Sequence, residues 1–167
     1  MAKFILLDTE TTGTDENDHI CQLAFIVLEG KKSEVYNSFC KPSLPISFGA
    51  MAIHNITNEM VETAPEYQHC EAAIALEALN TPENTLIIQN APFDLGMLKK
   101  EGFEWRGKVI DTLRVIHHLE PDLESHGLQY LRYAKDFYKE EDQICKSMNL
   151  ELKAHDALSD VVVLRQL

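Results

Sequence analysis

Apolar residues recur in short runs along this chain, and their spacing predicts the order of its secondary-structure elements. Alternating or continuous apolar stretches predict strands at residues 3–9, 19–28, 33–40, 85–89 and 109–111, the second and third forming a hairpin around Gly30. Apolar residues at helical spacing, with turn residues between them, predict helices at 58–62 and 66–79, a helix carrying Asp94 on its first turn, a helix ending at His118, and helices at 128–134 and 156–165.

Three leading strands followed by alternating helices and strands are typical of a mixed sheet covered on both faces. The sequence therefore predicts an α/β protein with a three-layer α/β/α arrangement and a mixed five-stranded sheet. Its 167 residues correspond to one domain, 1–167, which is long enough to bury a substantial core. No linker, repeat or low-complexity segment divides it.

Composition narrows the class of protein. Hydrophobic residues make up 45% and charged residues 25% of the chain, as in ordinary soluble globular proteins. No apolar run approaches the ~20 residues that a membrane span needs, and the N-terminal apolar stretch is too short for a signal peptide, so we expect a cytoplasmic protein. The four cysteines are scattered without a Cys-x-x-Cys pair, which favours reduced structural thiols over a zinc site or a disulfide framework: Cys21, Cys40, Cys70 and Cys145.

Acidic residues supply the candidate chemistry. Asp8 and Glu10 follow the first apolar run at a spacing of two, which places both carboxylates on one face of a strand. Asp94 follows the fourth strand, and His155 and Asp160 lie near the C-terminus. Four carboxylates gathered together would repel and resist ionisation, whereas two divalent cations would balance their charge and leave room for a phosphodiester.

The types of these residues also suggest the metal. An oxygen-only ligand set favours Mg²⁺ or Mn²⁺ over zinc, which prefers sulfur and imidazole. His155 is then more useful as a base than as a ligand, because an imidazole can accept a proton from water near neutral pH. The pattern therefore predicts phosphodiester hydrolysis assisted by two metal ions.

The order and spacing of these blocks resemble those of the DEDDh family of 3′-to-5′ exonucleases, which includes polymerase proofreading subunits, exonuclease X and ribonuclease T. By this resemblance Asp8 and Glu10 match the first block, Asp94 the second and Asp160 the third, while His155 is the histidine five residues before the last aspartate. Shorter segments that begin at residues 53, 111 and 126 also resemble the family, and the likeness extends over residues 4–163.

The resemblance implies a ribonuclease H-like exonuclease fold and two Mg²⁺ or Mn²⁺ ions bound by Asp8, Glu10, Asp94 and Asp160. It also implies release of nucleoside 5′-monophosphates from a single-stranded 3′ end. DNA is favoured over RNA as the substrate, in proofreading or repair, with a polymerase or repair complex as the partner. The residues expected near the terminal nucleotide are Thr11, Thr12, His54, Phe93 and Asn90.

The chain departs from the family pattern at two points. Asn55 stands where the family usually has glycine, although Asn tolerates a left-handed backbone better than other non-glycine residues, so the turn can survive. The chain also stops at Leu167, soon after Asp160, whereas the last helix of the family usually runs longer. This is compatible with a domain trimmed from a longer polypeptide.

Each motif also has a structural interpretation. Asp94 could cap a helix behind the turn at Asn90, Phe93 could be ordinary core, and His54 could be a loop histidine. Taken in order, however, the three blocks favour a nuclease over a chance match. An exoribonuclease and a catalytically inactive scaffold of a polymerase or repair complex stay open as alternatives.

Net charge limits how such a protein would bind nucleic acid. With 15 basic and 27 acidic residues the chain carries −12, opposite to the usual basic footprint. Two basic groups are candidates for phosphate contacts or for solvated helix faces, Lys99 with Lys100, Arg106 and Lys108, and Arg132 with Lys135 and Lys139. The charge predicts weak, salt-sensitive and distributive binding to a short single-stranded end.

Overall fold

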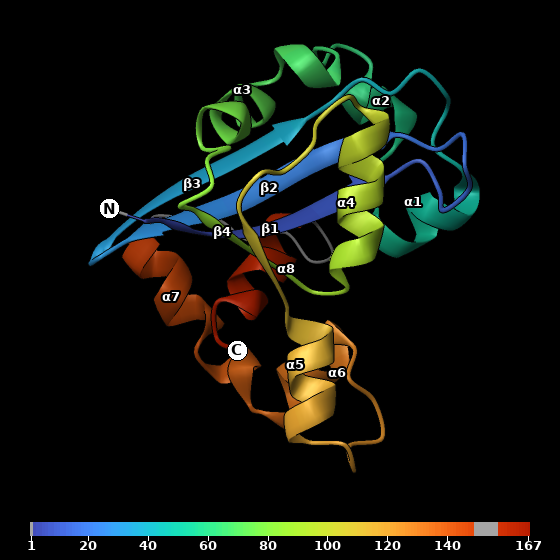
Figure 1. Cartoon of the computed structure of the whole chain (residues 1–167). Coiled ribbons are helices and arrows are strands. Elements are labelled where there is room, and N and C mark those ends of the chain that lie inside the picture. The colour runs from blue at the N-terminus through green and yellow to red at the C-terminus, as the bar shows by residue number, and fades with distance from the viewer. Residues whose placement is uncertain (1, 149–156) are drawn as a thin grey trace.

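The structure is a computed structural model that describes residues 2–148 and 157–167. Within these residues, the strands form one five-stranded sheet in the order β3-β2-β1-β4-β5 (Figure 1). β1 is antiparallel to β2 and parallel to β4, β2 is antiparallel to β3, and β4 is parallel to β5. The predicted mixed five-stranded sheet is therefore confirmed. The strands are β1 (Phe4–Thr11), β2 (Ile20–Glu29), β3 (Lys32–Phe39), β4 (Thr85–Ile88) and β5 (Lys108–Asp111).

Helices connect and cover these strands. The described α-helices are α1 (Phe48–His54), α2 (Asn58–Val61), α3 (Glu71–Ala78), α4 (Ala91–Lys100), α5 (Thr112–Leu119), α6 (Leu128–Ala134), α7 (Glu141–Met148) and α8 (Ala157–Leu164). Two short 3₁₀ helices are η1 (Tyr67–His69) and η2 (Phe137–Lys139). The hairpin of β2 and β3 turns at Gly30, whose φ of 60° is a conformation that glycine adopts at no steric cost.

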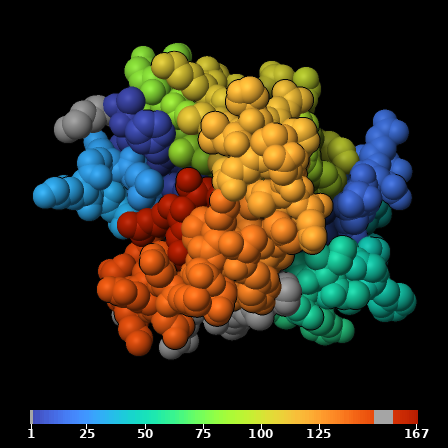
Figure 2. Space-filling model, turned by 90° about the horizontal axis from the view of Figure 1, so that it is seen from below, coloured from blue at the N-terminus to red at the C-terminus, as the bar shows by residue number. Residues whose placement is uncertain are grey.

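The pleat of β1 separates the core into two layers. Ile5 and Leu7 pack in a cluster that also contains buried residues of α3 and α4, whereas Leu6 packs in a second cluster with residues of α7 and α8. Figure 1 shows α3 on one side of the sheet and α7 and α8 on the other. In Figure 2 the orange and red segments of α6, α7 and α8 lie together on one face. The predicted three-layer α/β/α arrangement is therefore confirmed.

Helix prediction was less accurate than strand prediction. The single helix predicted at 66–79 is wrong, because the backbone at Cys70 is extended (φ −77°, ψ 147°) and separates η1 from α3. The sequence patterns did not predict α1 or α7. In α1 the side chains of Phe48 and Ile53 are exposed, so the helix has no clear apolar face, although Ser47 caps its start by accepting a hydrogen bond from the amide of Ala50.

Two expectations from composition can be compared with the fold. Cys21, Cys40, Cys70 and Cys145 are all buried free thiols, in agreement with their expected role as reduced structural residues. Among the helices of the described residues, none is long and apolar enough to cross a membrane.

Candidate active site

The end of the central strand carries the first two acidic residues. Asp8 and Glu10 have the same parity along β1 as Leu6, so they lie on the face of the sheet that α8 covers. In the ladder with β2, Asp8 lies opposite Ala24 and Glu10 opposite Gln22. Asp8 and Glu10 are both half-buried. The predicted common face of these two carboxylates follows directly from the period of a strand.

The third carboxylate comes from the last helix. Asp160 lies on the first turn of α8, and one oxygen from each of Asp8, Glu10 and Asp160 lies within 4.8 Å of the others. Gln129 of α6 donates a hydrogen bond from Nε2 to Oδ1 of Asp160 over 2.6 Å. This contact from α6 helps to orient the Asp160 carboxylate.

Asp94 approaches β1 from the other layer. It lies on the first turn of α4 and is only 3% exposed. Its Oδ1 accepts hydrogen bonds from the amide (3.1 Å) and the hydroxyl (2.7 Å) of Thr9, the residue between the first two acids. Burial raises the pKa of Asp94 to about 7, against the lowering effect of these hydrogen bonds. The structure thus brings three of the four predicted ligands into one cluster and places the fourth beside the same strand.

A strand-to-helix turn positions Asp94. Asn90 is the N-cap residue of α4 in a left-handed conformation (φ 63°), and Pro92 lies in the first helical turn, as the sequence predicted. Asp111 accepts hydrogen bonds from the amides of Asn90 and Leu113, each over 3.1 Å, and so joins the starts of α4 and α5. Asn90 is exposed and Phe93 is half-buried against the core.

The two threonines after Glu10 are held within their own loop. Thr11 donates its hydroxyl hydrogen to the carbonyl of Gly13, and Thr12 donates to Oδ1 of Asp18, both over 2.6 Å. Both residues are buried. A Cβ on Gly13 would lie 2.5 Å from Oδ2 of Asp18, so a larger residue here would displace the Asp18 carboxylate that Thr12 contacts. The two predicted nucleotide-binding threonines therefore shape the loop beside the acids, and the Thr12 hydroxyl also accepts a hydrogen bond of 3.1 Å from the amide of His19.

The side chain of His54 is buried, and both of its ring nitrogens are hydrogen-bonded within the protein. Its Nδ1 accepts from the amide of Ile56 (3.0 Å), so Nε2 carries the hydrogen and donates to the carbonyl of Thr11 (3.1 Å). Burial lowers its pKa, which favours this neutral form. The next residue, Asn55, is left-handed (φ 59°), in agreement with the expectation that Asn can replace glycine here.

The predicted base, His155, lies outside the described residues, as does the neighbouring Asp156. The cluster described here therefore consists of carboxylates alone. Asp160 is the residue of the third block that the structure places.

The two basic groups largely face acids of the same chain. Lys99 pairs with Glu104 (3.1 Å), and Lys100 donates to the carbonyl of Asp15 (2.8 Å). In the second group, each cation has a carboxylate partner: Arg132 with Glu141, Lys135 with Glu120, and Lys139 with Asp136. For Lys99 and Lys100 these contacts agree with the interpretation as a solvated helix face.

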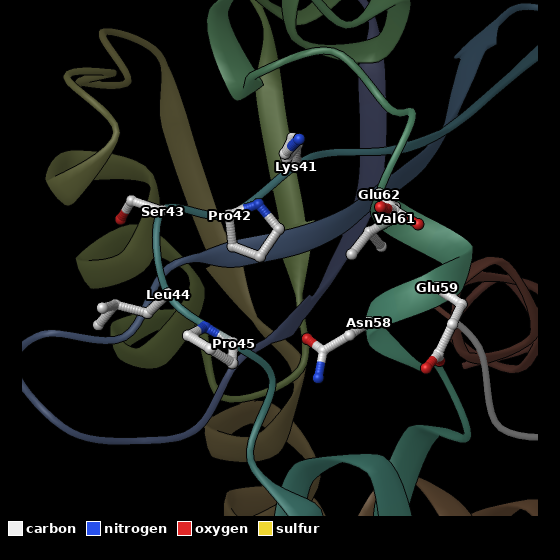
Figure 3. Close-up of a pocket in the computed structure, with 9 residues that line it drawn as sticks. All are labelled: Lys41, Pro42, Ser43, Leu44, Pro45, Asn58, Glu59, Val61 and Glu62. Carbon is white, nitrogen blue, oxygen red and sulfur yellow. The ribbon is translucent and has the colours of Figure 1, made fainter.

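A cavity of about 520 Å³ lies between the loop after β3 and α2 (Figure 3). Figure 3 shows Pro42 and Pro45 on one side and Asn58 on the other. None of the four predicted carboxylate ligands is among its lining residues, which are Lys41, Pro42, Ser43, Leu44, Pro45, Asn58, Glu59, Val61 and Glu62. This cavity is therefore separate from the carboxylate cluster, which stays the candidate active site.

Sequence reasoning missed three residues that support the site. Thr9 lies between the two acids, and its parity along β1 places it on the face of the sheet that α4 covers. Gln22 interrupts an otherwise apolar strand, which is a recognisable signal of a buried polar contact. Gln129 lies in the segment after residue 126 that resembles the family, but that resemblance assigns it no role.

The donor set fits a hard divalent cation. The three clustered groups offer carboxylate oxygen, the ligand type that Mg²⁺ and Mn²⁺ prefer, and their half-buried position combines solvent access with a low local dielectric. Three like charges so close together would otherwise repel one another.

The fold and the carboxylate cluster agree with the family to which the sequence of this chain is similar. The RNase T exonuclease profile matches residues 5–167, and the chain belongs to this exonuclease family. The family resemblance found in the sequence is thereby confirmed.

Particular relatives include DNA polymerase III PolC-type from Bacillus cereus, which is 30% identical over 91% of this chain and 10% of its own length. A DNA polymerase III subunit epsilon-like protein from Rhodobacter capsulatus is 31% identical over 78% of this chain and 19% of its own. The chain thus spans a small part of these relatives.

Solved structures with the same fold include exonuclease X in complex with 5′ overhanging duplex DNA, with a TM-score of 0.68 and 24% identity over 97% of this chain and 88% of that one. Escherichia coli exonuclease I in complex with a dA16 oligonucleotide has a TM-score of 0.71 and 21% identity over 99% of this chain and 40% of that one. At these identities the structures establish the fold.

Proposed function

We propose that this protein is a metal-dependent 3′-to-5′ exonuclease that releases nucleoside 5′-monophosphates from a nucleic-acid end. The observation that carries the proposal is the cluster formed by Asp8, Glu10 and Asp160, whose oxygens lie within 4.8 Å of one another on a fold of the exonuclease family. We infer cleavage at a chain end, and not inside the chain, because the family to which the protein belongs is an exonuclease family.

The carboxylates of Asp8, Glu10 and Asp160 would hold two Mg²⁺ or Mn²⁺ ions, with Asp94 as the fourth ligand. When bound, such ions stabilise the charge that develops on the phosphate and lower the pKa of water. Thr9 holds the Asp94 side chain through two hydrogen bonds. His155 would accept a proton from the attacking water.

The remaining side chains would bind the terminal nucleotide. Thr11 and Thr12 belong to the loop that follows the acids of β1, and Asn90 and Phe93 begin the helix that carries Asp94. His54 contributes through its bond to the Thr11 carbonyl, because both of its ring nitrogens already have partners within the protein. In this proposal His54 and the fully buried Thr12 shape the pocket, and Thr11, Asn90 and Phe93 line it.

DNA is the favoured substrate, and a polymerase or repair complex the favoured partner. Support comes from relatives named as DNA polymerase III proteins and from similar folds solved with DNA. A net charge of −12 favours weak, distributive binding of a single-stranded 3′ end, so processive degradation by the isolated chain in physiological salt would contradict this part of the proposal. RNA as the substrate and a scaffold without activity are the competing hypotheses.

The test uses matched 5′-labelled single-stranded DNA and RNA oligonucleotides with Mg²⁺, Mn²⁺ or chelator, beside an Asp8→Ala control. We expect a ladder that shortens from the 3′ end of DNA, requires metal and is absent in the control. A ladder on RNA would select the exoribonuclease alternative. No shortening of either substrate would overturn the proposed activity in favour of a scaffold.

A further inference from the structure

Gln22 is a buried carboxamide inside a strand of mostly apolar residues. It lies in β2 with only 1% of its surface exposed, between neighbours that are also buried. A carboxamide loses its hydrogen bonds to water when it enters a core, so burial at this position costs free energy unless partners replace them. The chain retains a polar group where an apolar residue would pack without this cost.

Both ends of the carboxamide have partners in different elements. Oε1 accepts a hydrogen bond of 3.1 Å from the amide of Ala157, the first residue of α8. Nε2 donates a hydrogen bond of 3.0 Å to Oδ1 of Asn37 in β3. The Ala157 amide thus has its acceptor in the sheet, so this hydrogen bond ties the first described turn of α8 to β2.

These contacts lie next to the candidate metal ligands. Gln22 is the β2 residue directly opposite Glu10, and Ala157 precedes Asp160 by one helical turn. The hydrogen bond therefore connects a strand position beside one acid of the cluster to a helix position beside another. Asn37 holds the opposite end of the carboxamide, which directs Oε1 toward α8.

Apolar packing by itself does not fix this register. Leu6, Ala24 and Ile26 of the sheet pack with Val161 and Val162 of α8, which holds the helix on the sheet. Dispersion contacts are nondirectional, whereas a buried hydrogen bond at the start of a helix restricts how far the helix can slide or turn. A small displacement of α8 would move Asp160 relative to two carboxylates that belong to β1.

We propose that Gln22 is a positioning residue that holds α8 in the register at which Asp160, Asp8 and Glu10 share a divalent cation. The inference rests on the proposed metal-dependent function. Gln22 does not touch the cation in this account, because its polar atoms face Ala157 and Asn37. Loss of its acceptor should weaken metal binding more than it weakens the fold.

Two substitutions of Gln22 separate these effects. Gln22→Met keeps a similar length and removes the amide oxygen. Gln22→Glu keeps an acceptor for the Ala157 amide, and because burial beside three acids favours its protonated form, its O–H can replace the donor to Asn37 without adding a charge to the cluster. The matched control is Asn80→Leu, because Asn80 is also a buried carboxamide with two hydrogen bonds, to Arg106 and Glu104, but it lies outside this contact.

Mn²⁺ binding to the whole chain is measured by calorimetry without nucleic acid, together with Tm in chelator. Disturbed outer partners of metal ligands typically cost 10- to 100-fold in affinity, so we expect Gln22→Met to raise the Mn²⁺ dissociation constant about tenfold. Gln22→Glu should stay within about threefold of the natural chain, as a conservative replacement of the acceptor. Asn80→Leu should lower Tm and leave Mn²⁺ affinity unchanged.

An unchanged Mn²⁺ dissociation constant in Gln22→Met, with a fall in Tm like that of Asn80→Leu, would overturn the positioning role. If Gln22→Met does not fold, the decision passes to Asn37→Ala, which removes the partner that directs the carboxamide from an exposed strand position. A raised dissociation constant there supports the role, and an unchanged one overturns it. Failure of the natural chain to bind Mn²⁺ would instead remove the proposed function on which the inference rests.

Discussion

Two parts of the candidate site reach the same cluster by different means. Asp8 and Glu10 are neighbours on one strand, and the pleat of β1, held between β2 and β4, is enough to align them. Asp160 arrives from the far end of the sequence on α8, and its place depends on how that helix packs against Leu6 and Ala24. The first pair is therefore fixed by local geometry, whereas the third carboxylate is fixed by tertiary packing. Changes in the two regions should have separable effects.

Removal of a carboxylate from the strand should have the largest effect on activity. We expect Asp8→Ala to abolish metal-dependent nucleotide release, because the cluster loses a ligand that no neighbour on β1 can replace. Tm in chelator should be unchanged or higher, since one source of repulsion among the three acids is gone. Thermal melting and the oligonucleotide assay give the two measurements, and retained turnover would exclude Asp8 from the site.

His155→Ala should have the second-largest effect on activity. Loss of a general base typically lowers the rate by roughly 10² to 10⁴. Mn²⁺ binding should persist, because the carboxylate ligands are intact. Single-turnover rates at saturating Mn²⁺ provide the measurement, with His118→Ala as a control on an exposed helix position. A rate equal to that of the natural chain would assign the proton transfer to another group.

The same contrast explains what sequence could predict. The common face of Asp8 and Glu10 and the places of the strands along the chain follow from short-range patterns, and both were predicted. The break at Cys70 depends on one residue's backbone conformation, and α1 exposes Phe48, so neither leaves an apolar period to detect. The hydrogen bond between Gln129 and Asp160 joins segments that are 31 residues apart in the sequence, and a single sequence does not show which distant segments meet in space.

Matched core substitutions on the two faces of the sheet should sharpen the comparison. Leu158 packs α8 on one face and Leu76 packs α3 on the other, and both side chains are buried. Replacing either by Ala should lower the free energy of unfolding by about 2–5 kcal/mol, as measured by urea denaturation in chelator. Leu158→Ala should also weaken Mn²⁺ binding several-fold, because Asp160 is on the same helix.

Leu76→Ala is the control for destabilisation without displacement of α8. Its Mn²⁺ affinity, measured where the protein is fully folded, should equal that of the natural chain. Equal losses of affinity in both variants would mean that general stability, rather than the docking of α8, determines metal binding.

Asp94 should give the stability of the metal-free protein a dependence on pH. Its pKa is raised to about 7 in the folded chain from an ordinary value of 3.8, mainly by burial, so between these values the folded state binds a proton that the unfolded state has lost. The free energy of unfolding should therefore fall as pH rises from 4 to 7. Asp94→Asn should flatten this fall, because its amide does not ionise. Urea denaturation in chelator at several pH values measures the difference. Identical slopes in the two proteins would show that Asp94 is ionised throughout, in which case its hydrogen bonds from Thr9 outweigh the effect of burial and Asp94 is held ready to bind metal as the carboxylates on β1 are.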